Sequence, residues 1–145
     1  MVLVTTLITI LCCFYGLIYN LSTLKVAISG GFEEVEEADE PMDTPYFYPA
    51  FYSMSAVCFV FYVCLLAFSV DLISGSFRTL IPFTIVAVLE VIHFVSVAKM
   101  WRHPRFGYSV AAASGVANGG LMAQFVILLP LWAPLVLWYA KLSTV

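Results

Sequence analysis

Residues 51–100 have the sequence FYSMSAVCFVFYVCLLAFSVDLISGSFRTLIPFTIVAVLEVIHFVSVAKM. Two apolar runs, residues 51–73 and 79–100, are separated in this stretch by a five-residue link, Ser74 to Arg78. An α-helix needs about 20 mostly apolar residues to cross about 30 Å of hydrocarbon, and each run meets that length. Because the link is so short, we expect two transmembrane helices that are antiparallel neighbours.

Two further apolar runs lie on either side of this pair. One covers residues 2–28, and the other covers about residues 118–140, with a start between Gly107 and Gly120. The chain is 63% hydrophobic and 10% charged, which excludes an ordinary soluble enzyme, a disordered chain and a basic nucleic-acid-binding protein. The sequence therefore predicts a single all-α integral membrane domain, in which four transmembrane helices form an antiparallel bundle.

An acidic loop, residues 29–50, joins the first two predicted spans. Seven of the nine acidic residues fall between Glu33 and Asp43, so the net charge of −3 belongs to this loop. Prolines at 41, 45 and 49 predict an extended second half. Aromatic residues at its end predict a belt at the membrane–water interface: Tyr46, Phe47, Tyr48, Phe51 and Tyr52.

Four polar residues within or at the ends of the spans are candidate site residues. Glu90 and His93 lie one helical turn apart near the middle of the third span, where a charge costs about 2.5–3.5 kcal/mol. We expect Glu90 to face the bundle interior, either as a proton- or cation-responsive group with His93 or as half of a structural hydrogen-bonded pair. Asn20 is expected to donate across a helix interface, and Asp71 is expected to be a helix-end group.

Small residues and the C-terminus provide two weaker signals. Ala111, Gly115 and Gly119 recur at four-residue spacing, which favours close helix packing but also fits a flexible loop. The C-terminal Ser143-Thr144-Val145 has the form of a PDZ-domain ligand. The four cysteines show no metal-ligand spacing and no nucleophile–base set is present, so we expect no metal, no cofactor and no enzymatic activity.

The order of several features resembles the four-span lysosome-associated transmembrane protein family and related insect four-span proteins. The resemblance covers Phe14–Asn20 and Phe51–Val97, and its most specific part is Leu80-Ile81-Pro82-Phe83 followed seven residues later by Glu90. It implies cytoplasmic termini, lumenal or extracellular long loops, and an adaptor role, with Asn20 and Glu90 as the corresponding positions. The count of basic residues favours the opposite orientation.

The chain departs from that family at its C-terminus. Members that bind ubiquitin ligases carry Pro-Tyr motifs on a long tail, whereas only a few residues follow the last predicted span here. Tyr139-Ala-Lys-Leu142 has the form of a tyrosine sorting signal but adjoins the membrane. The resemblance implies an endosomal or lysosomal location, and the plasma membrane is the alternative.

The leading functional hypothesis is a non-enzymatic accessory or adaptor protein. It would associate laterally with a larger membrane protein, or with copies of itself, and modulate assembly, trafficking or activity. Three alternatives stay open: a junctional or adhesive tetraspan with a PDZ-type C-terminus, a small proton-linked carrier or channel that uses Glu90 and His93, and a hydrophobic subunit of a respiratory complex. The expected partners are the lipid bilayer and membrane proteins, and no nucleic acid.

Overall fold

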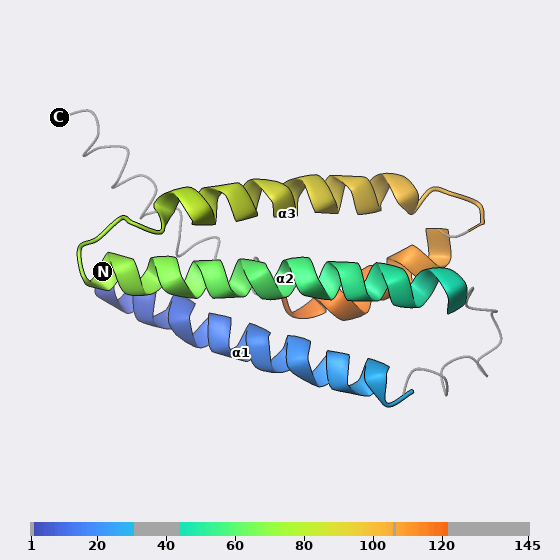
Figure 1. The fold of residues 1–145 in the computed structure, drawn as a ribbon, viewed down its shortest axis with the longest axis horizontal. Coiled ribbons are helices and arrows are strands. Elements are labelled where there is room, and N and C mark those ends of the chain that lie inside the picture. The colour runs from blue at the N-terminus through green and yellow to red at the C-terminus, as the bar shows by residue number, and fades with distance from the viewer. Residues whose placement is uncertain (1, 31–43, 106, 122–145) are drawn as a thin grey trace.

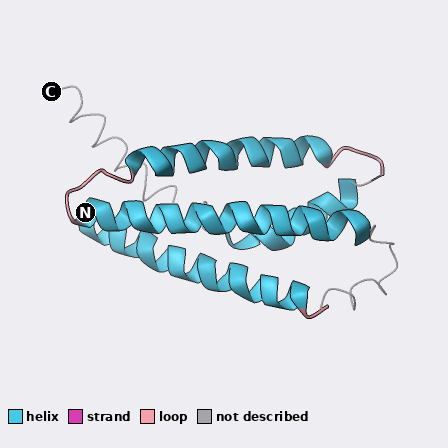
Figure 2. Cartoon of the chain, in the orientation of Figure 1, coloured by secondary structure: helices cyan, strands magenta, loops and turns pink. Residues whose placement is uncertain are grey.

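The computed structural model describes residues 2–30, 44–105 and 107–121, and these ranges are helical apart from short turns (Figure 1). The helices are α1 (Val2–Ile28), α2 (Thr44–Ile73) and α3 (Leu80–Met100). Residues 107–121 form a further helix, named here the 107–121 helix. The described ranges contain no strand (Figure 2), which confirms the all-helical expectation for this part of the chain.

Three helices are long and apolar enough to cross a membrane, as judged by length and composition. They contribute Leu3–Ile28, Tyr46–Ile73 and Leu80–Met100, which have 26, 28 and 21 residues. The chain is therefore consistent with a multi-pass membrane protein. The fourth predicted span, residues 118–140, lies outside the described residues beyond residue 121.

Helix α2 occupies the centre of the described structure and packs against both α1 and α3 (Figure 1). Phe68 of α2 and Phe83 of α3 stack with ring centroids 4.9 Å apart. The 107–121 helix contacts α1, because the Tyr19 hydroxyl donates a hydrogen bond of 3.1 Å to the backbone carbonyl of Val116. These contacts connect all four helices of the described structure.

A tight turn ends α2 and leads directly into α3. The backbone N–H of Ser76 donates to the carbonyl of Asp71, and that of Gly75 donates to the carbonyl of Leu72. This pair of bonds is a Schellman motif, and it requires the left-handed conformation that Gly75 adopts with φ of 71°. The short link predicted between residues 73 and 79 therefore has a defined geometry.

The N-terminal part of α2 differs from the sequence prediction. Residues 44–50 were expected to be extended and α2 to begin near Phe51, but the helix begins at Thr44. Pro45 lies in the first turn, where a missing N–H leaves no hydrogen bond unmade, and Pro49 lies only one turn further on. Prolines so close to a helix start are compatible with helix, and the expectation of an extended segment was wrong.

The aromatic residues in this part of α2 are divided between the interior and the surface of the described structure. Phe47 and Phe51 are buried, and their rings stack with centroids 6.1 Å apart. Tyr52 is exposed. The helical spacing of four residues places Phe47 and Phe51 on one inward face, and the belt at the membrane–water interface stays a prediction.

Two apolar clusters form the interior of the described structure. The first core cluster consists of Ala27, Phe47, Phe51, Met54, Val97, Val110, Ala113 and Ala117. The second core cluster consists of Cys13, Cys58, Phe61, Tyr62, Leu65 and Leu121, with Phe83, Val86, Ala87 and Phe94 of α3 packed against it. Each cluster receives side chains from all four helices of the described structure, so the two clusters follow one another along these helices.

Candidate functional site

A layer of buried polar side chains lies near the boundary between the two core clusters. Each helix contributes one residue, and we call this set the central polar layer: Asn20, Ser55, Glu90 and Asn118. Their exposed fractions are between 1% and 3%. Polar side chains at this depth in a membrane are costly and are typically found in functional or helix-pairing positions.

The position of the layer follows from the residues that flank it. On α1, Asn20 lies between Leu17 of the second cluster and Leu24 of the first. On α2, Ser55 lies between Met54 of the first cluster and Cys58 of the second.

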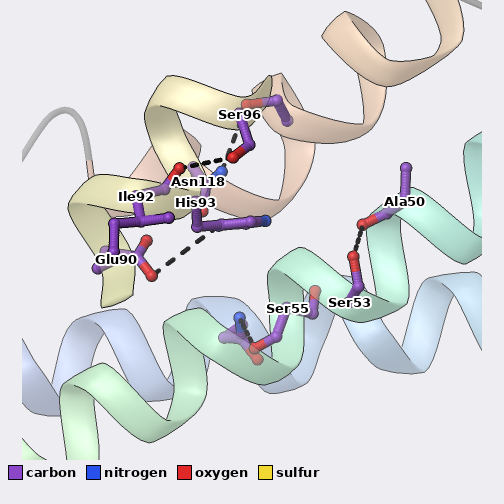
Figure 3. Close-up of polar contacts among 10 residues, drawn as sticks. Ala50, Ser53, Ser55, Glu90, Ile92, His93, Ser96 and Asn118 are labelled. Carbon is purple, nitrogen blue, oxygen red and sulfur yellow. Dashed lines mark hydrogen bonds and ion pairs between the residues drawn. The ribbon is translucent and has the colours of Figure 1, made fainter. Parts of the chain in front are cut away.

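The other two helices each contribute one residue to the layer. On the 107–121 helix, Asn118 directly follows Ala117 of the first cluster and precedes Leu121 of the second. On α3, Glu90 lies within the second cluster, because Ala87 before it and Phe94 after it both pack there. Figure 3 shows Ser55, Glu90 and Asn118 on their three helices.

One hydrogen bond within the layer joins α1 to α2. The Asn20 side-chain amide donates to the backbone carbonyl of Ser55 over 3.3 Å. The prediction that Asn20 donates across a helix interface is therefore realised in the geometry. This contact joins α1 to α2 in the interior of the described structure, as polar side chains in apolar helices often do.

Glu90 is the charged member of the layer. Both of its carboxylate oxygens are buried, and neither accepts a hydrogen bond from any described residue. His93 Nδ1 lies 4.0 Å from Glu90 Oε2 (Figure 3), which is beyond hydrogen-bond length. The structure thus places the predicted pair on one face of α3, with the two groups adjacent but not hydrogen-bonded.

The groups that face Glu90 from α2 are neutral. Cys58 and Tyr62 lie within electrostatic range of the carboxylate. All lysines and arginines in the described ranges are exposed, so none of them pairs with Glu90: Lys25, Arg78, Lys99, Arg102 and Arg105. His93 is the one neighbour of Glu90 in the described structure that can carry a positive charge.

Further polar atoms in and beside the layer lack partners among the described residues. The Ser55 and Tyr62 hydroxyls and the Asn118 side-chain carbonyl oxygen are buried without a hydrogen bond. The Asn118 amide nitrogen donates only to the Ser114 hydroxyl of its own helix, over 3.3 Å. A buried polar atom normally has a partner, so these unpaired oxygens, together with those of Glu90, make the polar layer a candidate binding site.

Asp71 has a different environment, at the end of α2. Its carboxylate Oδ2 accepts hydrogen bonds from the Thr79 backbone N–H over 2.9 Å and from the Thr79 hydroxyl over 2.6 Å. An acid at a helix N-terminus satisfies an otherwise unpaired N–H and interacts favourably with the helix dipole. Asp71 therefore caps α3 from α2 and is not part of the central polar layer.

The small-residue motif lies on a helix rather than in a loop, but its residues differ in environment. Ala111 is half-buried, whereas Gly115 is exposed, and a Cβ added to Gly115 would meet no described atom within 4 Å. Gly119 lies beside the Tyr19 hydroxyl, 3.2 Å from the position a Cβ would take. Packing inside the described structure uses the adjacent face, which carries Ala113 and Ala117.

Sequence reasoning missed two members of the layer. Ser55 was overlooked because a single serine in an apolar span is common and gives no signal. Asn118 gives no clear signal in the sequence because the composition of its segment fits helix and loop equally well. A helical interpretation of residues 107–121 would have placed it beside Ala117, on the buried face.

Two of the predicted segments lie outside the residues that the structure describes. Ser143, Thr144 and Val145 lie outside the described residues, as do all the acidic residues between Glu33 and Asp43. Within the ranges that are described, no group of three or more His, Cys, Asp or Glu side chains is positioned to hold a metal ion.

No family model matches the sequence, and no curated protein or solved structure is significantly similar to it. The described residues define a helical protein, and three of its described helices are long and apolar enough to cross a membrane. Its candidate site is the central polar layer.

Proposed function

We propose that the protein is a non-enzymatic membrane accessory or adaptor protein. It associates laterally with other membrane proteins and modulates their assembly, trafficking or activity. The observation that carries this proposal is a small-residue patch on the outward side of the 107–121 helix, where Gly115 is exposed and Ala111 and Gly119 are half-buried. Tyr108, at the start of the same helix, is exposed at 59%. Gly115, at the centre of this patch, has open space around it in the described structure.

This face differs from the outward faces of the other helices. Helix α3 exposes large aliphatic side chains, namely Ile81, Ile85, Val88, Leu89, Val91, Ile92 and Val95. Such side chains suit contact with lipid tails. Small residues on an outward face instead let a second helix approach closely, and they gain van der Waals contact that lipid does not supply equally well.

The partner is a helix of another membrane protein or of a second copy of this chain. The resemblance to a family of adaptors supports the same class of function, and an endosomal, lysosomal or plasma-membrane location is part of the proposal. Lateral association requires no catalytic group, so the exposed small-residue face is sufficient for it.

The test is quantitative co-purification of the full chain from its native membranes in mild detergent. Gly115→Leu fills the open space and should reduce association with specific partners by about tenfold, which corresponds to about 1.4 kcal/mol. Gly115→Ala keeps the face small and should retain association. Self-association of labelled chains in lipid vesicles, measured by energy transfer, distinguishes a second copy from a different partner.

The matched control is Ala98→Leu, which adds comparable bulk to an exposed position of α3. It should leave the set of co-purifying proteins unchanged. If Gly115→Leu and Ala98→Leu have the same effect, or if the native chain is a monomer without a reproducible partner, the proposal is wrong.

A further inference from the structure

The Glu90 carboxylate is buried in the central polar layer without a compensating partner. It is 2% exposed, and both of its oxygens lack a hydrogen-bond donor among the described residues. A carboxylate in an apolar interior is stable only when a positive charge or hydrogen-bond donors replace its lost hydration. Its charge must therefore be neutralised by something other than the basic side chains at the helix ends.

The surrounding atoms indicate the chemistry of the neutralising species. The other unpaired oxygens in and beside the layer belong to Ser55, Tyr62 and Asn118, and all of them are neutral. Carboxylate, hydroxyl and amide carbonyl oxygens bind small hard cations. Since one carboxylate is the single acidic group present in the described layer, the site balances one positive charge and is unsuited to a divalent ion.

We propose that the central polar layer binds one small monovalent cation, a proton or a sodium ion, at the Glu90 carboxylate. Ser55, Tyr62 and Asn118 carry other unpaired oxygens of the described structure and are the candidate neutral ligands. The ion faces Cys58 and Tyr62 from α2 and His93 from α3, and His93 is the one neighbouring group that competes with it by taking up a charge. The site is independent of the lateral association proposed for the 107–121 helix.

Carbodiimide labelling of the full chain in lipid vesicles tests the proposal. Dicyclohexylcarbodiimide is apolar and reacts with protonated carboxyl groups within membranes, and peptide mass spectrometry locates the product. Asp71 serves as an internal control, because its carboxylate lies at the helix end and is hydrogen-bonded to Thr79. We expect Glu90, but not Asp71, to react with the carbodiimide at about pH 7, where an ordinary glutamate is ionised.

Two arms distinguish the ions. Labelling is measured across a pH series, and at fixed pH with sodium chloride or an equal concentration of choline chloride. If the site binds sodium, sodium reduces the labelling of Glu90 and choline does not. If it binds only a proton, labelling falls as pH rises and is the same in both salts.

Infrared difference spectra between the native chain and Glu90→Gln provide a second measurement that needs no reagent to enter the site. A protonated Glu90 gives a carboxyl C=O band that is absent from the variant, and bound sodium removes this band. The proposal is overturned if Glu90 is ionised at neutral pH and unaffected by sodium. It is also overturned if Glu90 and Asp71 react with the same pH profile.

Substitution of a residue that carries one of the neutral oxygens tests whether these oxygens take part in ion binding. Asn118→Ala removes an acceptor and should weaken ion binding by about tenfold, seen as a shift of about one pH unit or a tenfold higher half-saturating sodium concentration. Ser69→Ala is the matched control, because Ser69 is equally buried but its hydroxyl donates to the Leu65 carbonyl, away from the layer. Equal shifts in both variants would assign the effect to general packing and contradict the role of Asn118.

Discussion

The two carboxylates of the described structure, Asp71 and Glu90, lie in opposite environments. Asp71 is half-buried and accepts two hydrogen bonds from Thr79. Glu90 is almost completely buried and accepts none from the described residues. An acid that is satisfied by its own chain contributes to structure, whereas an acid that is buried and unsatisfied is poised to bind something else.

The same difference in hydrogen bonding distinguishes the N-terminus of helix α3 from its middle. Its N-terminus is closed by Asp71 and by the Schellman turn around Gly75, so that polar groups there have partners. Its middle carries Glu90 and His93 without hydrogen bonds to the described residues. Mutations should therefore affect stability at the turn and ion binding at the layer, and four predictions separate these effects.

The largest effect is expected where α1 and α2 approach most closely, beside the layer. Gly16 faces the ring of Tyr62, and a Cβ at Gly16 would overlap several ring atoms, with Tyr62 Cε2 only 2.6 Å away. Gly16→Val should lower the free energy of unfolding by about 3 kcal/mol, because Tyr62 is buried and has little room to move. The measurement is unfolding of the chain by sodium dodecyl sulfate in mixed micelles.

Gly115→Ala is the control for this variant. Its Cβ meets nothing within 4 Å, and alanine is the better helix former, so stability should stay the same or rise by up to about 1 kcal/mol. Equal losses at Gly16 and Gly115 would show that glycine itself, rather than the close approach to Tyr62, is required.

The second effect concerns the satisfied carboxylate. Asp71→Ala removes both hydrogen bonds to Thr79 and leaves the N–H at the start of α3 without its partner, so we expect a loss of about 2 kcal/mol in the same unfolding measurement. Thr79→Val keeps the N–H bond and loses only the hydroxyl bond, and about half of that loss should follow. An unchanged stability in Asp71→Ala would show that the turn is held by its backbone bonds alone.

Much of the fold was predictable because apolar length is a direct physical requirement of the bilayer. The spans at residues 2–28 and 79–100 agree closely with α1 and α3, and the short link from Ser74 to Arg78 agrees with the observed turn. The start of α2 was mispredicted because proline was taken to break a helix. Pro45 and Pro49 lie so near the helix start that few hydrogen bonds depend on them.

The candidate site was predictable only in part. Glu90, His93 and Asn20 are conspicuous in apolar spans, since each is costly there, and the structure buries Glu90 and Asn20 in one layer. Ser55 and Asn118 were not found, because their role depends on which helix faces meet. The sequence also does not tell whether the small-residue face of the 107–121 helix points into the structure or outward, since four-residue spacing fits either side of the helix.

The third prediction concerns the hydrogen bond in the central polar layer. Asn20→Ala removes the bond from the Asn20 amide to the Ser55 carbonyl and should cost about 1 kcal/mol, because hydrogen bonds within membranes contribute modestly. Asn118→Ala is the matched comparison, since its side chain bonds only within its own helix, and it should cost less. A larger loss for Asn118→Ala than for Asn20→Ala would place the main helix–helix bond elsewhere in the layer.

The smallest effect on stability is expected for Glu90→Gln. Glutamine keeps the shape of the side chain and removes its charge, which has no hydrogen-bonded partner in the described structure to be lost. We therefore expect the unfolding free energy to change by less than about 0.5 kcal/mol, because the bound ion already neutralises the Glu90 carboxylate and glutamine replaces it with a neutral group of the same shape. Ion-dependent labelling and the infrared carboxyl band should disappear at the same time.

A large loss of stability in Glu90→Gln would instead indicate a structural ion pair between Glu90 and His93. If Glu90 and His93 form a structural ion pair across their 4.0 Å separation, Glu90→Gln leaves a buried charge on His93 without its partner. Loss of one member of a buried pair costs about 3–5 kcal/mol, several times the change expected here. The double variant Glu90→Gln with His93→Gln would then recover much of that loss, whereas it should leave stability unchanged if the Glu90 carboxylate binds an ion.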